Sequence, residues 1–344
     1  MAEKPELKLT YDPSTIEDLG FKIYSQIPNA LAEFIANAYD ADATVVRLVL
    51  NQKSFFGAAI EVIDNGCGMN FDDLNNKFLR IGRKRRKEHG QLFSKDYHRK
   101  VTGKKGLGKL ALLGLASRVV FETKTKEMTE SIQFTLDFTK FRDETIAVYK
   151  PEFSYVEKPD FESGTKIKLF DLTRTTDIKA EELAVSLSKL FQFFDKSFIC
   201  TITSENGKQY KVNNSLRYAS LVPNHEWKLP DFMENHSNNY AYKDKVTGNL
   251  FTTEKPLRSL RGITLFSNGR MVKPSSFFGK DSESSFFYSY ITGDINVDFI
   301  DDFVPDVIGT GRQDIVWSSP EASELGEYLE EILKAVEKDW RLKE

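Results

Sequence analysis

Cysteine, histidine and long apolar runs are all scarce in this chain. Two cysteines and four histidines occur among 344 residues, so a disulfide framework is excluded and a zinc site is not expected. The longest apolar runs, Val45–Leu50 and Leu110–Ala116, are far shorter than the roughly 20 residues that a membrane-spanning helix needs. The polar N-terminus does not resemble a signal peptide. We therefore expect a cytoplasmic protein with no membrane partner.

An excess of charge of one sign is also missing. The formal net charge is −3 with 29% charged residues, so no overall basic field marks the chain as a nucleic-acid binder. Any contact with nucleic acid must be local. The length and the 40% hydrophobic content predict about two domains. A polar stretch near residues 172–179 suggests a first domain over 1–175 and a second over 180–344.

The first informative string is Glu33–Ala41 (EFIANAYDA). Apolar residues recur at helical spacing from Ile23 to Asp40, which predicts a long helix. At about 100° per residue, Glu33, Asn37 and Asp40 fall within one narrow stripe of that helix. This helix therefore presents carboxylate and amide groups along one line while its other face packs into a core.

The second string is Asp64–Met69 (DNGCGM), which follows a predicted strand. The β-branched content of Val45–Leu50 and Ala59–Asp64 predicts two strands. Asp-Asn-Gly alone is typical of an ordinary turn. Its position directly after a hydrophobic strand also fits a carboxylate on a glycine-rich turn at the edge of a binding site.

The third string is Gly103–Lys109 (GKKGLGK), at the end of a long polar segment that we interpret as a lid over about residues 70–105. A phosphate-binding P-loop is disfavoured because Leu110 stands where Ser or Thr is needed, and the Rossmann pattern is disfavoured because residues 95–100 are no buried strand. The remaining interpretation is a glycine-rich lid end leading into a helix over Gly108–Ala116. Its N-terminus would attract phosphate, helped by Lys104, Lys105 and Lys109.

The other predicted elements complete two mixed units. In the first domain, helix, strands, lid, helix and further strands indicate an α+β layered sandwich, because the strands lie too close together for a βαβ repeat. The second domain is also predicted to be α+β. Its predicted elements are a helix over Ala180–Phe194, strands at Ser197–Thr203 and Gly262–Phe266, a polar excursion over Asp231–Lys255, and an amphipathic helix from Pro320 with Leu325, Leu329, Ile332, Leu333 and Val336 as its apolar stripe. The further first-domain strands are Arg118–Thr123, Ser131–Phe138 and Thr165–Asp171.

These strings together resemble the motifs of the GHKL ATPases, which include gyrase B, the ninety-kilodalton heat-shock chaperones, histidine kinases and MutL. Gly164–Ile167 resembles their fourth motif, so the resemblance covers roughly residues 20–175. It implies a Bergerat-type layered α/β sandwich followed by a transducer-like α+β domain. The third string is more similar to bacterial MORC-like members than to MutL, whose arginine and glutamate in this motif are absent here.

The resemblance also implies roles for single residues. Glu33 would be the general base that deprotonates the attacking water, and Asn37 the Mg²⁺ ligand. Asp64 would bind the adenine amine, supported by Thr165 through a water. For Asp40, lining the nucleotide and completing the helix stripe remain equal alternatives. The other expected ATP contacts are Gly66, Gly68, Met69, Lys104, Lys105, Gly106, Leu107, Gly108 and Lys109, whereas Cys67 is interpreted as a small filler.

Two segments of the second half resemble parts of the family that sense the γ-phosphate. Ser267–Lys273 is similar to a strand region of MutL-type transducer domains. Ile308–Ile315 (IGTGRQDI) resembles the chaperone segment whose arginine contacts the γ-phosphate. Arg312 is the first candidate for this role, Gln313 is a weaker one, and Lys273 is the third choice.

The resulting prediction is an enzyme that binds Mg-ATP, hydrolyses it slowly, closes a lid and forms a nucleotide-dependent homodimer. The favoured output is an ATP-gated clamp acting on DNA. The alternatives are a chaperone-like or signalling scaffold acting on a protein client, and a nucleotide-binding module with little turnover. A histidine kinase is disfavoured because little sequence precedes Glu33. The basic run Arg83–Lys87 is interpreted as a solvated part of the lid rather than as a nucleic-acid contact.

Overall fold

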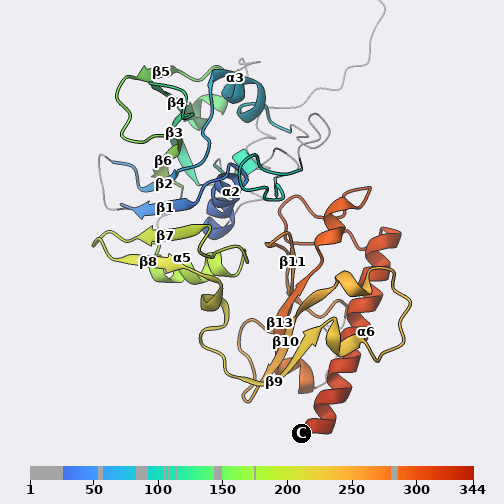
Figure 1. The fold of residues 1–344 in the computed structure, drawn as a ribbon. Coiled ribbons are helices and arrows are strands. Elements are labelled where there is room, and N and C mark those ends of the chain that lie inside the picture. Colours follow the sequence, from blue (N-terminus) through green and yellow to red (C-terminus); the bar gives the residue numbers. More distant parts are fainter. Residues whose placement is uncertain are drawn as a thin grey trace, which may run out of the picture. The chain divides into compact units, whose positions relative to one another are not determined.

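The computed structural model describes residues 26–52, 57–82, 92–103, 106, 108–112, 115–142, 149–173, 176–279 and 286–344. The chain forms two compact units (Figure 1). The first unit comprises Met1–Ala184 and Lys196–Val212, and the second comprises Val185–Asp195 and Asn213–Glu344. The boundary between them falls inside helix α5 (Ala180–Ser188). Each unit is described by itself below.

An eight-stranded sheet forms the centre of the first unit, in the order β5-β4-β3-β6-β2-β1-β7-β8. All neighbouring strands are antiparallel except β1 and β7, which are parallel. Alternate residues of the strands are buried, as expected for a sheet with one face in a core. The strands are β1 (Val45–Leu50), β2 (Ile60–Asp64), β3 (Ala116–Lys124), β4 (Ser131–Asp137), β5 (Phe153–Val156), β6 (Gly164–Leu172), β7 (Ile199–Thr203) and β8 (Gln209–Val212).

Helix α2 (Ile27–Asp40) is the main helix of this unit. Pro28 lies in its first turn, where a missing N–H costs nothing, and most of its apolar side chains are buried. The other helical segments are short. They are α3 (Phe71–Asp73), the π-helical turn η1 (Leu74–Phe78), and the 3₁₀ turns η2 (Gly108–Leu112) and η3 (Phe138–Arg142).

The structure corrects two expectations for the first unit and adds one strand. The helix predicted over Gly108–Ala116 is instead the 3₁₀ turn η2, because the chain already enters β3 at Ala116. The strand predicted near 197–203 is β7, which pairs with β1 and therefore belongs to the first sheet. Strand β5 was not predicted, since its side chains are mostly exposed and show no alternation. The helix α2 and strands β1, β2, β3, β4 and β6 are confirmed.

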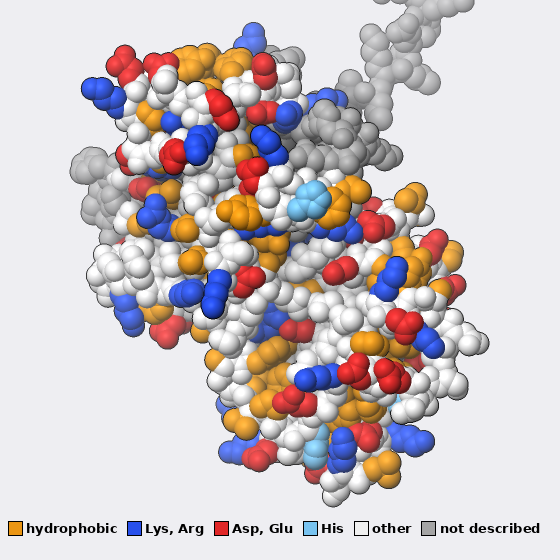
Figure 2. All heavy atoms as spheres, in the orientation of Figure 1, with side chains coloured by type: hydrophobic (Ala, Val, Ile, Leu, Met, Phe, Trp, Pro, Cys, Tyr) orange, Lys and Arg blue, Asp and Glu red, His pale blue; other side chains and the backbone are white. Residues whose placement is uncertain are grey.

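Strand β5 forms one edge of the sheet and carries exposed aromatic side chains. Phe153 and Tyr155 are about half exposed, and the Phe153 ring lies 5.4 Å from that of Phe71, at the start of α3. Figure 2 shows hydrophobic side chains gathered at the end of the first unit where β5 and α3 lie.

The second unit is a five-stranded sheet in the order β12-β11-β13-β10-β9, packed against the long helix α6 (Pro320–Lys343). The apolar stripe predicted for α6 is buried in this core. The remaining elements are β9 (Pro223–Leu229), β10 (Thr247–Thr253), β11 (Gly262–Ser267), β12 (Arg270–Ser276), β13 (Ile291–Asn296), η4 (Asn214–Tyr218), η5 (Asp231–Met233), η6 (Lys243–Lys245), η7 (Phe286–Ser289) and η8 (Asp298–Asp302).

Two expectations for the second half are also corrected. The helix predicted to reach Phe194 ends at Ser188, because Phe191, Phe193 and Phe194 pack on one another. The segment expected to be a polar excursion contains the buried strand β10. Both units combine helices with a mostly antiparallel sheet, so the predicted α+β class is confirmed. Among the residues described, no helix is long and apolar enough to cross a membrane.

Candidate functional site

The first and third strings meet where Glu33 lies against Gly108. Turn η2 packs on helix α2, and a Cβ atom on Gly108 would overlap the carboxylate of Glu33. Glu33 is half-buried, whereas Asn37, one turn later, is exposed. A carboxylate and a carboxamide therefore lie next to each other on α2, at the point where the glycine string begins η2.

Asp40, the third residue of the α2 stripe, is buried and binds the loop that leads into the glycine string. Its Oδ1 accepts hydrogen bonds from the backbone N–H of Thr102 at 2.8 Å and from the Thr102 hydroxyl at 3.1 Å. Its Oδ2 accepts a hydrogen bond from the N–H of Gly103 at 2.9 Å. Both ends of the described string thus touch the same helix, at Asp40 and at Glu33.

The second string docks on the C-terminal end of α2. The N–H of Cys67 donates to the carbonyl of Ala41 at 2.8 Å, and a Cβ atom on Gly66 would lie 2.8 Å from that same oxygen. The N–H of Gly66 also donates to Oδ1 of Asp64 at 2.8 Å. A glycine at 66 is therefore required by the close approach of two backbone segments.

Asp64 is a carboxyl with a strongly perturbed proton affinity. Burial raises its pKa to about 6, against the lowering effect of hydrogen bonds from the backbone N–H groups of Gly66 and Thr165. A perturbed carboxyl at the end of a buried strand is a common feature of binding sites. Asp64 and Thr165 are directly paired between β2 and β6.

Thr123, a residue that the sequence analysis missed, connects this region to the neighbouring strands. Its hydroxyl accepts the N–H of Met69 at 3.1 Å, donates to the carbonyl of Gly164 at 2.9 Å and lies 3.1 Å from the hydroxyl of Thr165. Gly68 has a φ of +64°, and a Cβ atom there would overlap the carbonyl of Lys124. The second and fourth strings are thus packed backbone to backbone around Thr123.

Asn65 was also missed, because Asp-Asn-Gly looks like a plain turn. Its Oδ1 accepts the N–H groups of Thr44 at 2.9 Å and Val45 at 2.8 Å, and its Nδ2 donates to the Thr44 hydroxyl at 2.8 Å. The side chain fastens the end of β2 to the start of β1. Cys67 is exposed at its surface, but burial, followed by the charges of Asp64 and Asp42, raises the pKa of its thiol. The raised pKa disfavours the reactive thiolate form, and the filler role remains a prediction.

Several predicted phosphate contacts lie outside the described residues. Lys104, Lys105 and Leu107 belong to this group, and the side chain of Lys109 does as well. Gly106 is described: it has a φ of +63°, and its carbonyl accepts the N–H of Gly82 at 3.2 Å. For the metal, no group of three His, Cys, Asp or Glu side chains gathers among the residues described. The carboxamide oxygen of Asn37 is a hard donor of the kind that Mg²⁺ accepts, and its role as a metal ligand remains a prediction.

A buried arginine, Arg99, anchors the segment that leads to the glycine string. It donates to the carbonyls of Tyr39 at 3.2 Å, Ala43 at 2.5 Å and Ser197 at 3.0 Å. Its guanidinium carbon also lies 4.5 Å from the ring centre of Tyr39. This part of the predicted lid is therefore fixed to α2 and to the segments that lead into β1 and β7.

In the second unit, Lys273 forms an ion pair with Asp314 at 2.8 Å. The hydrogen bond from Lys273 lowers the pKa of Asp314. Asp314 closes the turn that carries Arg312: its carbonyl accepts the N–H of Gly309 at 2.8 Å, and Arg312 itself has a φ of +51°. The roles proposed for Arg312, Gln313 and Lys273 at a γ-phosphate remain predictions.

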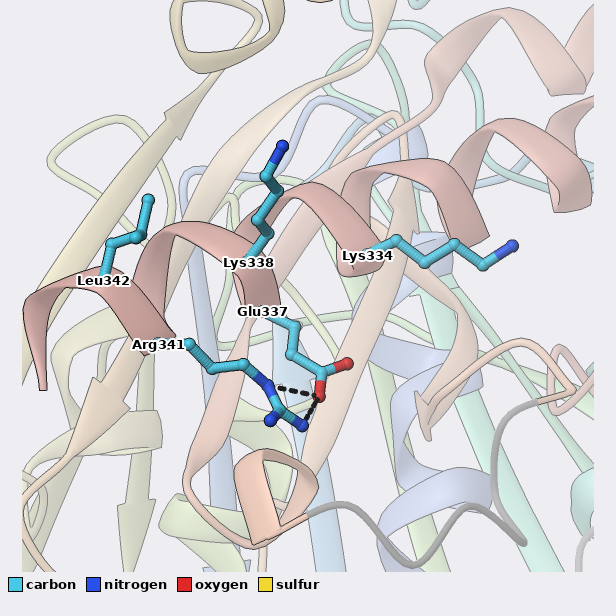
Figure 3. Close-up of a pocket in the computed structure, with 5 residues that line it drawn as sticks. All are labelled: Lys334, Glu337, Lys338, Arg341 and Leu342. Carbon is cyan, nitrogen blue, oxygen red and sulfur yellow. Dashed lines mark hydrogen bonds and ion pairs between the residues drawn. The ribbon is translucent and has the colours of Figure 1, made fainter.

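A hollow of about 400 Å³ lies on the exposed side of α6, in the second unit (Figure 3). Figure 3 shows Arg341 bonded to Glu337, with the neighbouring lysines pointing away from this pair. All its lining residues come from one helix, and none belongs to the strings above. They are Lys334, Glu337, Lys338, Arg341 and Leu342. We assign no binding role to this hollow.

Comparison with known proteins supports the resemblance of the first unit. Residues 24–165 match the family described as histidine kinase-, DNA gyrase B-, and HSP90-like ATPase. The chain is 26% identical, over an alignment of 351 positions that covers 97% of its length, to the protein named "Putative type II restriction enzyme HgiDII" from Herpetosiphon aurantiacus. It is also 29% identical over 132 residues, or 38% of its length, to the DNA mismatch repair protein MutL of Flavobacterium johnsoniae. It spans 56% of the first relative and 19% of the second.

Proposed function

We propose that this protein binds Mg-ATP and hydrolyses it slowly. Its residues 24–165 form a GHKL-type ATPase domain, which supports this proposal. The observation that carries the proposal is the contact between Glu33 and Gly108. It brings the carboxylate expected to activate water to the glycine string expected to hold phosphates. The resemblance of the strings to family motifs supports the same assignment.

Each site residue has a separate role in the proposed reaction. Glu33 orients the attacking water and accepts its proton. Asn37 offers a carboxamide oxygen to the metal, which when bound offsets the charge of the phosphates. Asp64 accepts a hydrogen bond from the adenine amine, and the Thr123–Thr165 hydroxyl pair holds the strands beside it. Catalysis then depends on positioning and on fixed charges rather than on a covalent intermediate.

We further propose that ATP drives dimerisation and that the output is a clamp acting on DNA. The names of the two relatives, a type II restriction enzyme and a mismatch repair protein, support a DNA-related role. The face of the protein in Figure 2 has interspersed acidic and basic side chains. With a formal net charge of −3, we expect any contact with DNA to be local or to be created by dimerisation.

The test is light scattering of the protein alone, with ADP, and with a nonhydrolysable ATP analogue. Dimers only with the analogue would support gating, since a ligand shifts an equilibrium only by favouring one state. A constant mass in all three samples would reject it. ATP hydrolysis should then be measured with duplex DNA at about 50 and about 200 mM salt, where phosphate contacts weaken steeply. Salt-sensitive stimulation supports the clamp, whereas stimulation only by a protein client would favour the scaffold.

A further inference from the structure

The segment immediately before the glycine string is a small hairpin. Phe93 and Lys100 form a bridge, the N–H of Ser94 donates to the carbonyl of Arg99 at 2.8 Å, and the N–H of Val101 donates to the carbonyl of Leu92 at 2.9 Å. The hairpin ends in the buried residues Val101 and Thr102. Gly103, the first residue of the glycine string, follows directly.

Asp42, two residues after the end of α2, holds this hairpin through its carboxylate. Asp42 accepts the N–H groups of Asp96 at 2.8 Å and Tyr97 at 3.1 Å. Burial alone would raise the pKa of Asp42, but these hydrogen bonds, a further one from Ser94 and the charge of Arg99 lower it below its usual value. The carboxylate is therefore kept ionised and bonded to the hairpin, which makes the hairpin a fixed support.

Asp40 continues this support to the glycine string. Its carboxylate is 5% exposed and accepts three hydrogen bonds, two from Thr102 and one from Gly103. Asp40 and Glu33 are seven residues apart, which places them on the same face of α2 about 10 Å from each other. Gly103 contacts the carboxylate of Asp40, and Gly108 lies against the carboxylate of Glu33.

We infer that Asp40 is a positioning residue that holds the Thr102 and Gly103 amides and so fixes where the glycine string begins relative to Glu33. This inference rests on the proposed ATP site and decides between the two roles left open for Asp40. With both carboxylate oxygens engaged by the loop, Asp40 acts on the nucleotide through the loop. Its loss should therefore weaken binding of the phosphates but not of the base.

The test compares the wild type with Asp40→Asn and with the matched control Asp72→Asn, an exposed carboxylate in α3. In nucleotide-free protein, hydrogen exchange at the backbone amide of Thr102 or of Gly103 should become at least about tenfold faster in Asp40→Asn, because asparagine keeps one acceptor oxygen and its NH₂ group cannot accept the second amide. Exchange in Asp72→Asn should not change. In calorimetry, the Kd for Mg-ATP should rise by about tenfold or more in Asp40→Asn, while the Kd for adenosine stays constant.

Unchanged exchange at both amides would overturn the inference, and so would an equal weakening of ATP and adenosine. Thr102→Val provides a second variant if Asp40→Asn does not fold, since it removes only the hydroxyl donor. It should accelerate exchange at Gly103 by a smaller factor, and unchanged exchange there would also count against the inference. If the wild type binds no ATP, the proposed function fails, whereas the exchange experiment still decides the role of Asp40.

Discussion

The carboxylate of Glu33 lies so close to Gly108 that no side chain fits between them. The obstructing atoms are the far end of a flexible side chain, so an added methyl group would displace the carboxylate rather than the fold. We therefore expect Gly108→Ala to fold normally and bind ATP, but to hydrolyse it about 10- to 100-fold more slowly, because general-base catalysis depends on close positioning.

A double variant separates this effect from a general loss of activity. Glu33→Asp shortens the side chain and makes room for the methyl group that Gly108→Ala introduces. The fold-loss of ATP hydrolysis in the double variant should then be clearly smaller than the product of the fold-losses in the two single variants. If the fold-losses of turnover simply multiply, the contact between these two residues does not matter for turnover.

Asp64 should make the stability of the nucleotide-free protein fall as pH rises from about 4 to about 6. Its pKa is about 6 in the fold and 3.8 as a free side chain, so in this interval the folded state keeps a proton that the unfolded state has lost. Above pH 6 the buried carboxylate costs up to about 3 kcal/mol. Asp64→Asn should remove this cost and raise the Tm at pH 7.5 by several degrees.

The same variant should weaken ATP binding, because the neutral amide oxygen is a weaker acceptor for the adenine amine than a carboxylate, and the amide NH₂ group cannot accept it at all. Binding by the wild type should weaken as pH falls through about 6, where Asp64 takes up a proton. The phosphates of ATP titrate nearby, so the informative quantity is the difference between wild type and Asp64→Asn. Parallel pH profiles would rule out Asp64 as the adenine contact.

Arg99 should be a major source of stability in the first unit. It supplies donors to three carbonyls and is 7% exposed. Arg99→Met should lower the free energy of unfolding by about 3 kcal/mol, since it removes three hydrogen bonds to buried or part-buried carbonyls. Arg118→Met is the control. Arg118 also stacks on an aromatic ring, Phe170, but its side chain is 46% exposed. Arg118→Met should therefore lower the free energy of unfolding by less than about 1 kcal/mol. Equal costs in denaturant titrations would contradict this assignment.

The ion pair between Lys273 and Asp314 should matter for turnover more than for stability. Asp314 is 65% exposed, so the pair contributes at most about 1 kcal/mol. If the turn it holds presents Arg312 to ATP, Lys273→Asp should reduce turnover several-fold with little change in Tm. Combining it with Asp314→Lys should recover part of that turnover. If the double variant turns over no faster than Lys273→Asp alone, Lys273 has no positioning role.

Local sequence patterns were sufficient for part of the fold. Apolar periodicity located α2 and α6, and β-branched content located β1 and β2, because each of these elements buries a regular face. The contact of Glu33 with the glycine string follows the motif resemblance as well. The proposed roles of the individual site residues remain to be measured.

Other features depend on contacts between distant residues, which no local pattern records. Thr123 and Asn65 act through hydrogen bonds to residues on neighbouring strands. Strand β7 joins β1 across about 150 intervening residues, and β5 is too exposed to alternate. The predicted helix after Gly108 is only a 3₁₀ turn, since entry of the next residues into the sheet outweighs their helix propensity.

The most direct test of the central claim measures ATP binding and ATP hydrolysis on the same samples of wild type, Glu33→Ala and the exposed control Glu157→Ala. We predict that all three bind Mg-ATP with similar affinity. We also predict that the wild type and the control hydrolyse ATP at similar rates, whereas Glu33→Ala hydrolyses it at least about 100-fold more slowly. Undiminished turnover in Glu33→Ala, or no ATP binding by the wild type, would contradict the account.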